Sequence, residues 1–185
     1  MTDSAALISL LAQRSVRRGN FTLASGRSST YYVDARLTTM SPDGMSLIGP
    51  WGLSQIRAAG WHADAVGGLT LAADPIAYAI AYASTREPPL VRAFTVRKEA
   101  KQHGTGRLVE GPLAEGDAVV IVEDVITSGQ SALRAAEGVR GAGARVLGVI
   151  ALVDREEGGR AAIEAAGYGL RCLTTITELL GQPIG

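Results

Sequence analysis

The amino-acid sequence predicts an α/β fold with a mostly parallel central sheet flanked by helices. From about residue 63 onward, short β-rich runs alternate with helical patterns, an order that requires crossover connections between parallel strands. One run, Val119–Val122, is apolar throughout, as expected for a strand that is covered on both faces. The chain contains no internal repeat, low-complexity tract or long linker, so we expect residues 1–185 to form one domain.

The composition is that of an ordinary globular protein. Of the 185 residues, 46% are apolar and 19% are charged, unlike a disordered or membrane-embedded chain. Eighteen basic and eighteen acidic side chains balance, so we expect neither nucleic acid nor a membrane as a partner. The N-terminus lacks the pattern of a secretory signal and Cys172 is the single cysteine, so we expect a cytoplasmic location.

The N-terminal region predicts a helix followed by two β-rich runs. Residues 3–18 place apolar side chains near one helical face, and Gly19 is the expected stop. Phe21–Leu23 and Tyr31–Val33 are rich in aromatic or β-branched residues and flank a turn of serine, glycine and threonine.

A second helix and a series of alternating elements follow. Ser41-Pro42-Asp43 predicts a helix start and Gly60 its end, while Pro50 is expected to kink or interrupt this helix. The remaining expected elements are, in order, strand Ala63–Val66, helix Pro75–Ala83, strand Leu90–Thr95, strand Ala118–Val122, helix Gln130–Ala142, strand Arg145–Val153, helix 159–166 and strand Leu170–Leu173.

The stretch VVIVEDVITSGQS, residues 119–131, predicts a binding site for a phosphorylated sugar. The turn Thr127-Ser128-Gly129 and the helix start after it offer backbone N–H groups and hydroxyls, which suit a phosphate. The adjacent carboxylates of Glu123 and Asp124 would repel a phosphate, so we expect them to face sugar hydroxyls or a Mg²⁺ ion. Ligands of parallel sheets bind outside the carboxyl ends of the strands, where this pair is expected. The alternative is a capped helix preceded by solvated acids.

A second segment, VRKEAKQHGTGR (residues 96–107), concentrates positive charge. Its Lys98 and Lys101 are the only two lysines in a chain with sixteen arginines, and His103 is one of two histidines. Ammonium and guanidinium groups are not interchangeable, so two lysines this close together indicate a specific role. Two glycines in the segment are typical of a mobile lid. An exposed basic loop is the alternative, but beside a phosphate-binding turn we favour anion binding.

Two further segments predict parts of the same site. VGGLTLAADP, residues 66–75, is either a second phosphate-binding turn or a plain tight turn before a helix at Asp74-Pro75. Arg155 follows a strand, where its guanidinium could grip a planar carboxylate or form a surface ion pair. Neither a G-x-x-x-x-G-K-[ST] motif nor the glycine spacing of a dinucleotide-binding fold occurs, which argues against both of those nucleotide-binding classes.

Together these segments resemble the type I phosphoribosyltransferases, and within them the orotate phosphoribosyltransferases. VVIVEDVITSG is similar to the family's signature for binding phosphoribosyl pyrophosphate. FTLASGRSSTYYVDAR, FTVRKEAKQHGTGRLVEG and ALVDRE are similar to segments of the orotate enzymes in the same order. The resemblance spans about residues 20–158. It implies the type I phosphoribosyltransferase fold, in which about residues 1–40 form a small hood over the base site.

The resemblance also implies a role for individual residues. The implied catalytic residues are Lys101, His103 and Asp124. The residues implied to bind phosphoribosyl pyrophosphate are Arg97, Lys98, Lys101 and His103 at the pyrophosphate, Glu123 and Asp124 at the ribose hydroxyls, and Val125, Ile126, Thr127, Ser128, Gly129, Gln130 and Ser131 at the 5′-phosphate. The residues implied to bind orotate are Thr127, Arg155, Tyr31 and Tyr32.

The implied activity is Mg²⁺-dependent transfer of the phosphoribosyl group to orotate, giving orotidine 5′-phosphate and pyrophosphate in de novo pyrimidine (UMP) synthesis. Breaking the C1′–O bond builds negative charge on the pyrophosphate, which the basic segment and a Mg²⁺ ion held mainly by the substrate would stabilise. In the family, the loop that carries Lys101 and His103 closes over the active site of the partner subunit, which implies a homodimer.

The chain departs from the family pattern at two places. Many members have lysine where this chain has Ala24, and a tyrosine-lysine pair where it has Leu71-Ala72, so positive charge is lost. Two other functions remain as alternatives. A non-catalytic regulator on the same fold would carry a basic face, which the balanced charge argues against. A purine phosphoribosyltransferase would have less use for Arg155, because its base carries no carboxylate.

Overall fold

In a computed structural model, the chain forms a six-stranded sheet flanked by helices and a separate two-stranded sheet. The structure describes residues 4–22, 26, 28–99 and 108–182. The strands are β1 (Val16–Thr22), β2 (Ser28–Val33), β3 (Ala65–Leu69), β4 (Arg92–Val96), β5 (Val109–Glu110), β6 (Ala118–Ile126), β7 (Arg145–Asp154) and β8 (Gly169–Thr175). The helices are α1 (Ser4–Ser15), α2 (Arg36–Thr39), α3 (Pro42–Ala58), α4 (Asp74–Ser84), α5 (Gln130–Gly141), α6 (Gly159–Ala165) and α7 (Ile176–Leu180).

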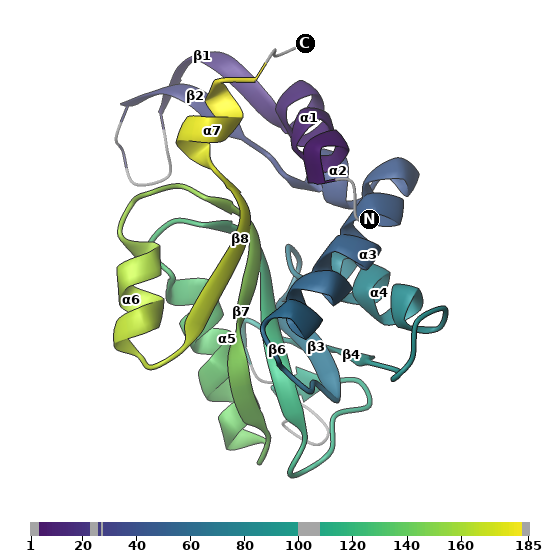
Figure 1. The fold of residues 1–185 in the computed structure, drawn as a ribbon. Helices are drawn as coiled ribbons and strands as arrows, with labels where there is room; N and C mark the ends of the chain where they lie inside the picture. Colours follow the sequence, from purple (N-terminus) through teal and green to yellow (C-terminus); the bar gives the residue numbers. More distant parts are fainter. Residues whose placement is uncertain (1–3, 23–25, 27, 100–107, 183–185) are drawn as a thin grey trace.

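The large sheet confirms the predicted α/β architecture. Its strand order is β5-β4-β3-β6-β7-β8, with β5 antiparallel to β4 and all other neighbours parallel. Helices α3 and α4 cover one face, and α5 and α6 cover the other (Figure 1). Along β6, Val120 and Val122 pack on the first face while Val119 and Ile121 pack on the second. This two-sided burial explains why the strand is apolar without alternation.

Two glycines in β3 let neighbouring strands and α4 approach closely. Gly67 and Gly68 are buried inside the strand. A Cβ on Gly67 would collide with the carbonyl oxygen of Phe94, and one on Gly68 with the carbonyl oxygen of Val122. The strand was predicted to end at Val66, before these glycines, and this bound is wrong because both glycines pair with β4 inside β3. A phosphate-binding turn in this segment stays a prediction. The turn itself begins after Leu69.

The N-terminal region differs from its prediction in where the first helix ends. Helix α1 stops at Ser15, and Gly19 lies inside β1 instead of terminating a helix. Strand β1 pairs antiparallel with β2, with Val16 opposite Val33, and this pairing outweighs the helical pattern. The two predicted β-rich runs lie in these strands, except that Leu23 is outside the described residues.

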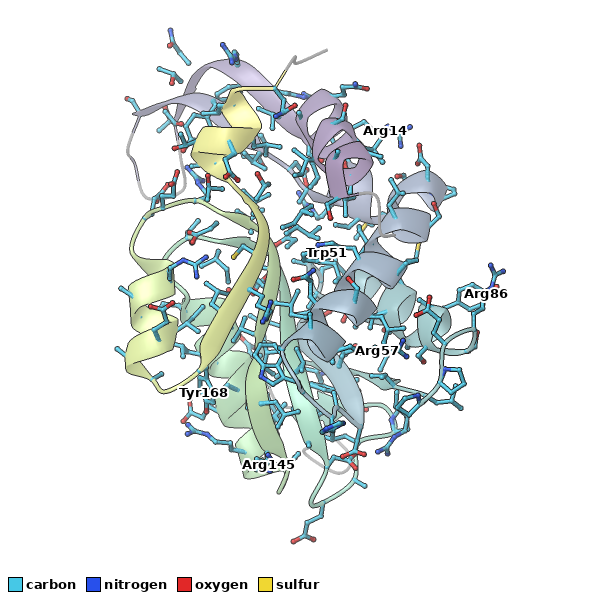
Figure 2. All side chains as sticks on the ribbon, in the orientation of Figure 1. Arg14, Trp51, Arg57, Arg86, Arg145 and Tyr168 are labelled. Atoms are coloured by element: carbon cyan, nitrogen blue, oxygen red, sulfur yellow. The ribbon has the colours of Figure 1, made fainter. Side chains whose placement is uncertain are left out.

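Helix α3 packs against the sheet and begins with a capped end. The Ser41 hydroxyl accepts a hydrogen bond from the Gly44 N–H at 3.2 Å, which confirms the predicted helix start. The helix is continuous across Pro50, so the interruption expected there is not observed. Trp51 of this helix is 2% exposed and contributes to the core (Figure 2).

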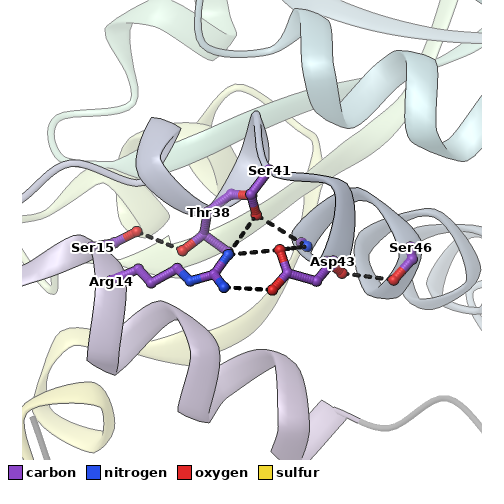
Figure 3. A network of polar contacts seen from close by, with 7 residues as sticks. Arg14, Ser15, Thr38, Ser41, Asp43 and Ser46 are labelled. Atoms are coloured by element: carbon purple, nitrogen blue, oxygen red, sulfur yellow. Dashed lines mark hydrogen bonds and ion pairs between the residues drawn. The ribbon is translucent and has the colours of Figure 1, made fainter. Parts of the chain in front are cut away.

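A polar network fastens α1 to α2 and α3 (Figure 3). Arg14 Nη1 donates to Asp43 Oδ1 at 2.6 Å and to the Ser41 hydroxyl at 3.1 Å. The hydrogen bond from Arg14 holds the pKa of the Asp43 carboxyl well below its usual range. At the buried end of the network, the hydroxyls of Ser15 and Thr38 lie 2.7 Å apart. The N-terminal helix is thereby fixed to a helix that packs on the sheet.

The elements β1, β2, α1 and α7 gather at the carboxyl ends of the parallel strands (Figure 1). Strand β8 leads directly into α7, which starts with a capping box: Glu178 N–H donates to the Thr175 hydroxyl, and Thr175 N–H donates to the Glu178 carboxylate. Arg18 of β1 donates to the Leu180 carbonyl at 2.6 Å, which ties the hairpin to α7. These elements lie over the sheet edge where the sequence predicts the site.

Candidate active site

The predicted acidic pair lies inside β6, near its carboxyl end. The strand continues to Ile126 instead of ending at Val122, because its backbone stays paired with β7 as far as Asp154. Glu123 is 4% exposed, and within the described ranges its Oε2 has no hydrogen-bond partner. Asp124 Oδ1 accepts a hydrogen bond from the N–H of the next residue at 2.7 Å. The alternative of solvated acids is therefore wrong for Glu123.

Burial changes the protonation of this pair. Burial, with the Asp124 charge as a second cause, raises the pKa of Glu123 to about 8. Burial also raises the pKa of Asp124. Near neutral pH, Glu123 therefore keeps its proton. One carboxyl can donate a hydrogen bond while the other accepts, a combination that suits the two hydroxyls of a vicinal diol.

The turn after β6 has the predicted strand-turn-helix form. Helix α5 begins at Gln130, directly after Gly129, which adopts a left-handed conformation with φ of 79°. Thr127 is half-buried and Ser128 is exposed. A Cβ on Gly159, the first residue of α6, would lie 2.9 Å from the Gly129 nitrogen and would collide with the Thr127 carbonyl. Helix α6 thus supports the turn whose N–H groups start α5.

A cavity of about 500 Å³ lies beyond the carboxyl ends of β3 and β4. It is lined by Thr70, Thr95, Arg97, Lys98, Glu99 and Glu110. Asp74, the first residue of α4, accepts hydrogen bonds from the Thr70 hydroxyl at 2.7 Å and the Thr95 hydroxyl at 2.8 Å. Sequence reasoning placed Asp74 at a helix start but missed that it joins both strand ends. Leu71 beside it is 58% exposed and carries no charge.

The start of the basic segment lies at this cavity. Arg97 and Lys98 follow β4 and line the cavity, so two of the four predicted pyrophosphate contacts are brought to one place. Arg134 of α5 donates to the Lys98 carbonyl at 2.8 Å, which fixes the backbone there. The other two, Lys101 and His103, lie outside the described residues, as does Ala24.

Arg155 is held in a largely buried position at the end of β7. Its backbone N–H donates to the Ile126 carbonyl at 2.9 Å, and its side chain is only 12% exposed. The guanidinium carbon lies 5.3 Å from the centroid of the Tyr31 ring. Nη2 lies 2.8 Å from Glu157 Oε1 and 3.4 Å from the Tyr31 hydroxyl. In the described part of the chain, the buried Nε has no partner. Arg155 therefore forms an ion pair with Glu157, but the pair is largely buried, unlike the surface ion pair considered as an alternative.

The two predicted tyrosines differ in their surroundings. Tyr31 is half-buried, and its ring lies against the Arg155 guanidinium. Tyr32 is 41% exposed and packs on Phe21, with 5.7 Å between ring centroids. Consecutive residues of a strand point to opposite faces, which explains the difference. The structure brings Tyr31 to Arg155 and places Tyr32 on the other side of the hairpin.

Two charged residues at the site were not found from the sequence. Glu157 pairs with Arg155, but nothing in its spacing indicates this. Arg36 forms two hydrogen bonds with Asp34, at 2.7 and 2.9 Å, and its charge opposes the rise in the pKa of Asp124 that burial causes. Both ion pairs join residues two positions apart, but that spacing alone does not indicate a contact, and the effect of Arg36 on Asp124 joins distant segments of the chain.

Other features of the described residues bear on chemistry. Among them, no group of three or more His, Cys, Asp or Glu side chains could hold a metal ion. Cys172 of β8 is half-buried, and burial raises the pKa of its thiol to about 12, as expected for an unreactive side chain. None of the helices that the structure describes is long and apolar enough to cross a membrane.

Known proteins of one family match this chain over most of its length. A family model described as "Phosphoribosyl transferase domain" matches residues 53–174, more than half of the chain. An orotate phosphoribosyltransferase from Aquifex aeolicus is 45% identical over 97% of this chain and 99% of its own length. An orotate phosphoribosyltransferase from Rhodopirellula baltica is 44% identical over 98% of this chain and 96% of its own length. The crystal structure of the orotate phosphoribosyltransferase from Mycobacterium tuberculosis H37Rv has a TM-score of 0.85, with 44% identity over 96% of this chain and 98% of that one.

The chain therefore belongs to the phosphoribosyltransferase family and has the type I fold. Within that family, it falls among the orotate phosphoribosyltransferases, which are enzymes of the glycosyltransferase class. An adenine phosphoribosyltransferase from Saccharomyces cerevisiae has a TM-score of 0.67 at 21% identity, which shows a shared fold alone.

Proposed function

We propose that this protein transfers the phosphoribosyl group of phosphoribosyl pyrophosphate to orotate in the presence of Mg²⁺. The products are orotidine 5′-phosphate and pyrophosphate, in de novo pyrimidine (UMP) synthesis. Its curated relatives carry the name of this activity at 44–45% identity over nearly the whole chain. The structure of the Mycobacterium tuberculosis enzyme in complex with phosphoribosyl pyrophosphate is 40% identical, with a TM-score of 0.80.

The environment of Arg155 is the observation that supports orotate as the acceptor. Its guanidinium is largely buried, lies over the Tyr31 ring and keeps an unsatisfied Nε donor among the described residues. A flat base with a carboxylate fits this environment. The ring of the base can stack on an aromatic side chain, and its carboxylate can accept hydrogen bonds from the Arg155 guanidinium. Thr127 directly follows Ile126, the last residue of β6, which pairs with Asp154 beside Arg155, so we assign Thr127 to the base site as well.

For the donor, we assign the ribose hydroxyls to Glu123 and Asp124 and the 5′-phosphate to residues 125–131. The unpartnered Glu123 Oε2, buried beside Asp124, supports the first assignment in the part of the chain that is described. The left-handed Gly129 and the start of α5 support the second. Asp124 would also favour the positive charge that builds on the ribose as the C1′–O bond breaks.

We assign the leaving pyrophosphate to Arg97, Lys98, Lys101 and His103. The cavity at Arg97 and Lys98 supports this for the first two. Mg²⁺, when bound, would neutralise further charge on the pyrophosphate. The described residues offer no cluster of three acidic or imidazole ligands, so we assign its ligands mainly to oxygens of the substrate.

We also propose that residues 1–185 form one domain, in which about residues 1–40 act as a hood over the base site. The position of β1 and β2 beside the strand ends supports this (Figure 1). Family membership further supports a homodimer in which Lys101 and His103 reach the partner's site. The single cysteine is compatible with a reducing, cytoplasmic setting.

The test is an absorbance assay of orotate consumption with phosphoribosyl pyrophosphate and Mg²⁺. Hypoxanthine and uracil serve as parallel acceptors, because one probes purine transfer and the other lacks the carboxylate. We expect rapid consumption of orotate and little of either control. Preferential use of hypoxanthine would instead make the protein a purine phosphoribosyltransferase.

A further inference from the structure

We propose that Glu157 is a positioning residue for Arg155: its carboxylate holds the guanidinium over the Tyr31 ring, oriented for the carboxylate of the acceptor base. The inference rests on the proposed function, because it takes orotate as the acceptor. It adds a residue to which the sequence pattern assigned no role.

The contacts of Arg155 define its orientation. Nη2 is shared between Glu157 Oε1 at 2.8 Å and the Tyr31 hydroxyl at 3.4 Å, while the Tyr31 ring lies under the guanidinium at 5.3 Å from its centroid. An arginine side chain has many rotamers, and fixing it at the moment of binding costs conformational entropy. Contacts that fix it beforehand remove that cost from substrate binding.

The remaining donors point to a second acceptor. Arg155 Nε is buried, and none of the described residues accepts its hydrogen bond. A guanidinium binds a carboxylate best through two parallel N–H groups. A carboxylate on the bound base could satisfy Nε while Glu157 continues to hold the group in place. An unsatisfied buried donor costs free energy in the free protein, and binding would recover it.

Of the acids in this loop, Glu157 is the one that forms an ion pair with Arg155, and the neighbouring Asp154 and Glu156 bind other groups. Asp154 accepts from Arg160 Nε at 3.0 Å and from the Glu156 N–H at 2.9 Å. The Glu156 carboxylate accepts from the backbone N–H of Thr177 at 3.2 Å, at the start of α7. These bonds fix the backbone on both sides of the loop. Among the described residues, Glu157 and Tyr31 are the ones that bind the side chain of Arg155.

The test measures steady-state kinetics of Glu157→Ala with both substrates varied. If Glu157 positions Arg155, the KM for orotate rises about tenfold or more, while kcat and the KM for phosphoribosyl pyrophosphate stay within about twofold. Glu157→Gln, which keeps an oxygen acceptor, recovers part of the loss. Any slow transfer to uracil is unchanged, because uracil has no carboxylate for Arg155 to bind.

Glu164→Ala is the matched control, since it removes the same charge from an exposed residue whose ion pair, at 3.5 Å, is with Arg160. An orotate KM in Glu157→Ala that is unchanged or lower overturns the inference; a lower value would mean that Glu157 competes with the substrate. A wild type that does not use orotate overturns the proposed function and this inference together. Should Glu157→Ala fail to fold in a thermal melt, Glu157→Asp, which shortens the side chain but keeps its charge, is judged by the same criterion.

Discussion

Glu123 holds a proton in the folded protein at a pH where an exposed glutamate would be ionised. Burial raises its pKa from 4.5 to about 8, so between these values the folded state binds more protons than the unfolded state. The contribution of Glu123 to the free energy of unfolding is therefore fully present below its unfolded pKa of 4.5. It is lost as the pH rises through its folded pKa of about 8. The same burial that costs stability at high pH supplies a protonated carboxyl, which we assign to hydrogen bonding with the ribose.

We expect Glu123→Gln to remove this pH dependence, because the amide does not titrate. The free energy of unfolding of the wild type should fall relative to the variant by on the order of 1 kcal/mol per pH unit between the two pKa values. Denaturant titrations across that pH range measure the difference. The control is Glu164→Gln at an exposed residue, whose free energy of unfolding should change with pH as it does in the wild type. Equal slopes in wild type and Glu123→Gln would contradict the protonation assigned to the buried carboxyl.

Asp124→Asn should weaken donor binding more than orotate binding. In the proposed site, the carboxylate would accept hydrogen bonds from ribose hydroxyls that orotate lacks, so we expect a loss of about tenfold or more for phosphoribosyl pyrophosphate. Calorimetry with each ligand separately measures both affinities. A similar loss for the two ligands would remove the ribose role from this residue.

Lys101→Ala should lower kcat by about 100-fold or more, because it removes a cation to which we assign stabilisation of the departing pyrophosphate. Stopped assays at saturating substrates measure the change. Arg86→Ala, which removes a cation that lies over Tyr82 on α4, is the control and should leave kcat unchanged. Turnover close to wild type in Lys101→Ala would exclude the basic segment from the chemistry.

At the scale of single residues, the sequence predicted chemistry wherever a local pattern encodes it. Glu123 and Asp124 follow an apolar strand and precede a glycine turn, so their place was readable. The contacts of Glu157 and Arg36 could not be found. The loop conformation decides which neighbouring acid pairs with Arg155, and the effect of Arg36 on Asp124 joins distant segments of the chain. The hydroxyl bonds of Asp74 join residues from two different strand ends, which no spacing reveals.

At the scale of elements, the contact between α6 and the turn after β6 yields a further prediction. Gly159→Ala would push a methyl group against the Gly129 nitrogen and the Thr127 carbonyl. We expect a loss of about 1–3 kcal/mol in the free energy of unfolding and a raised KM for phosphoribosyl pyrophosphate. Chemical denaturation and steady-state kinetics measure the two effects.

The control for this prediction is Gly141→Ala at the end of α5, where a Cβ would meet nothing within 4 Å. It should leave the KM for phosphoribosyl pyrophosphate within error of the wild type and should not lower the free energy of unfolding, because alanine favours a helix over glycine. A Gly159→Ala variant with wild-type donor KM would mean that the turn does not need the support of α6.

Element types were predictable where periodicity was strong, and boundaries were not. The helix at Gln130 was predicted to its first residue, because an apolar strand and a glycine turn precede it. The end of α1 was misplaced, since pairing with β2 decides it. Helix α7 was missed although its capping box, Thr175 to Glu178, is visible in the sequence. Strand β5 was missed because two residues are too few to show a pattern.

At the scale of the whole molecule, strand order brings the parts of the site together. The neighbours β4, β3, β6 and β7 end at one edge of the sheet, so the cavity at Arg97, the acidic pair and Arg155 follow one another across it. The alternation of strands and helices predicted a parallel sheet with its ligands at that edge. The order of strands and the placement of the hairpin beside their carboxyl ends come from packing between distant segments, which no local pattern encodes.

The most direct measurement of the central claim is the mass balance of the reaction. Wild-type protein is incubated with orotate, phosphoribosyl pyrophosphate and Mg²⁺, and the products are separated and quantified. We predict that each orotate consumed yields one orotidine 5′-phosphate and one pyrophosphate. Pyrophosphate released without the nucleotide, or no consumption of orotate at all, would contradict the proposal that this site joins the two substrates.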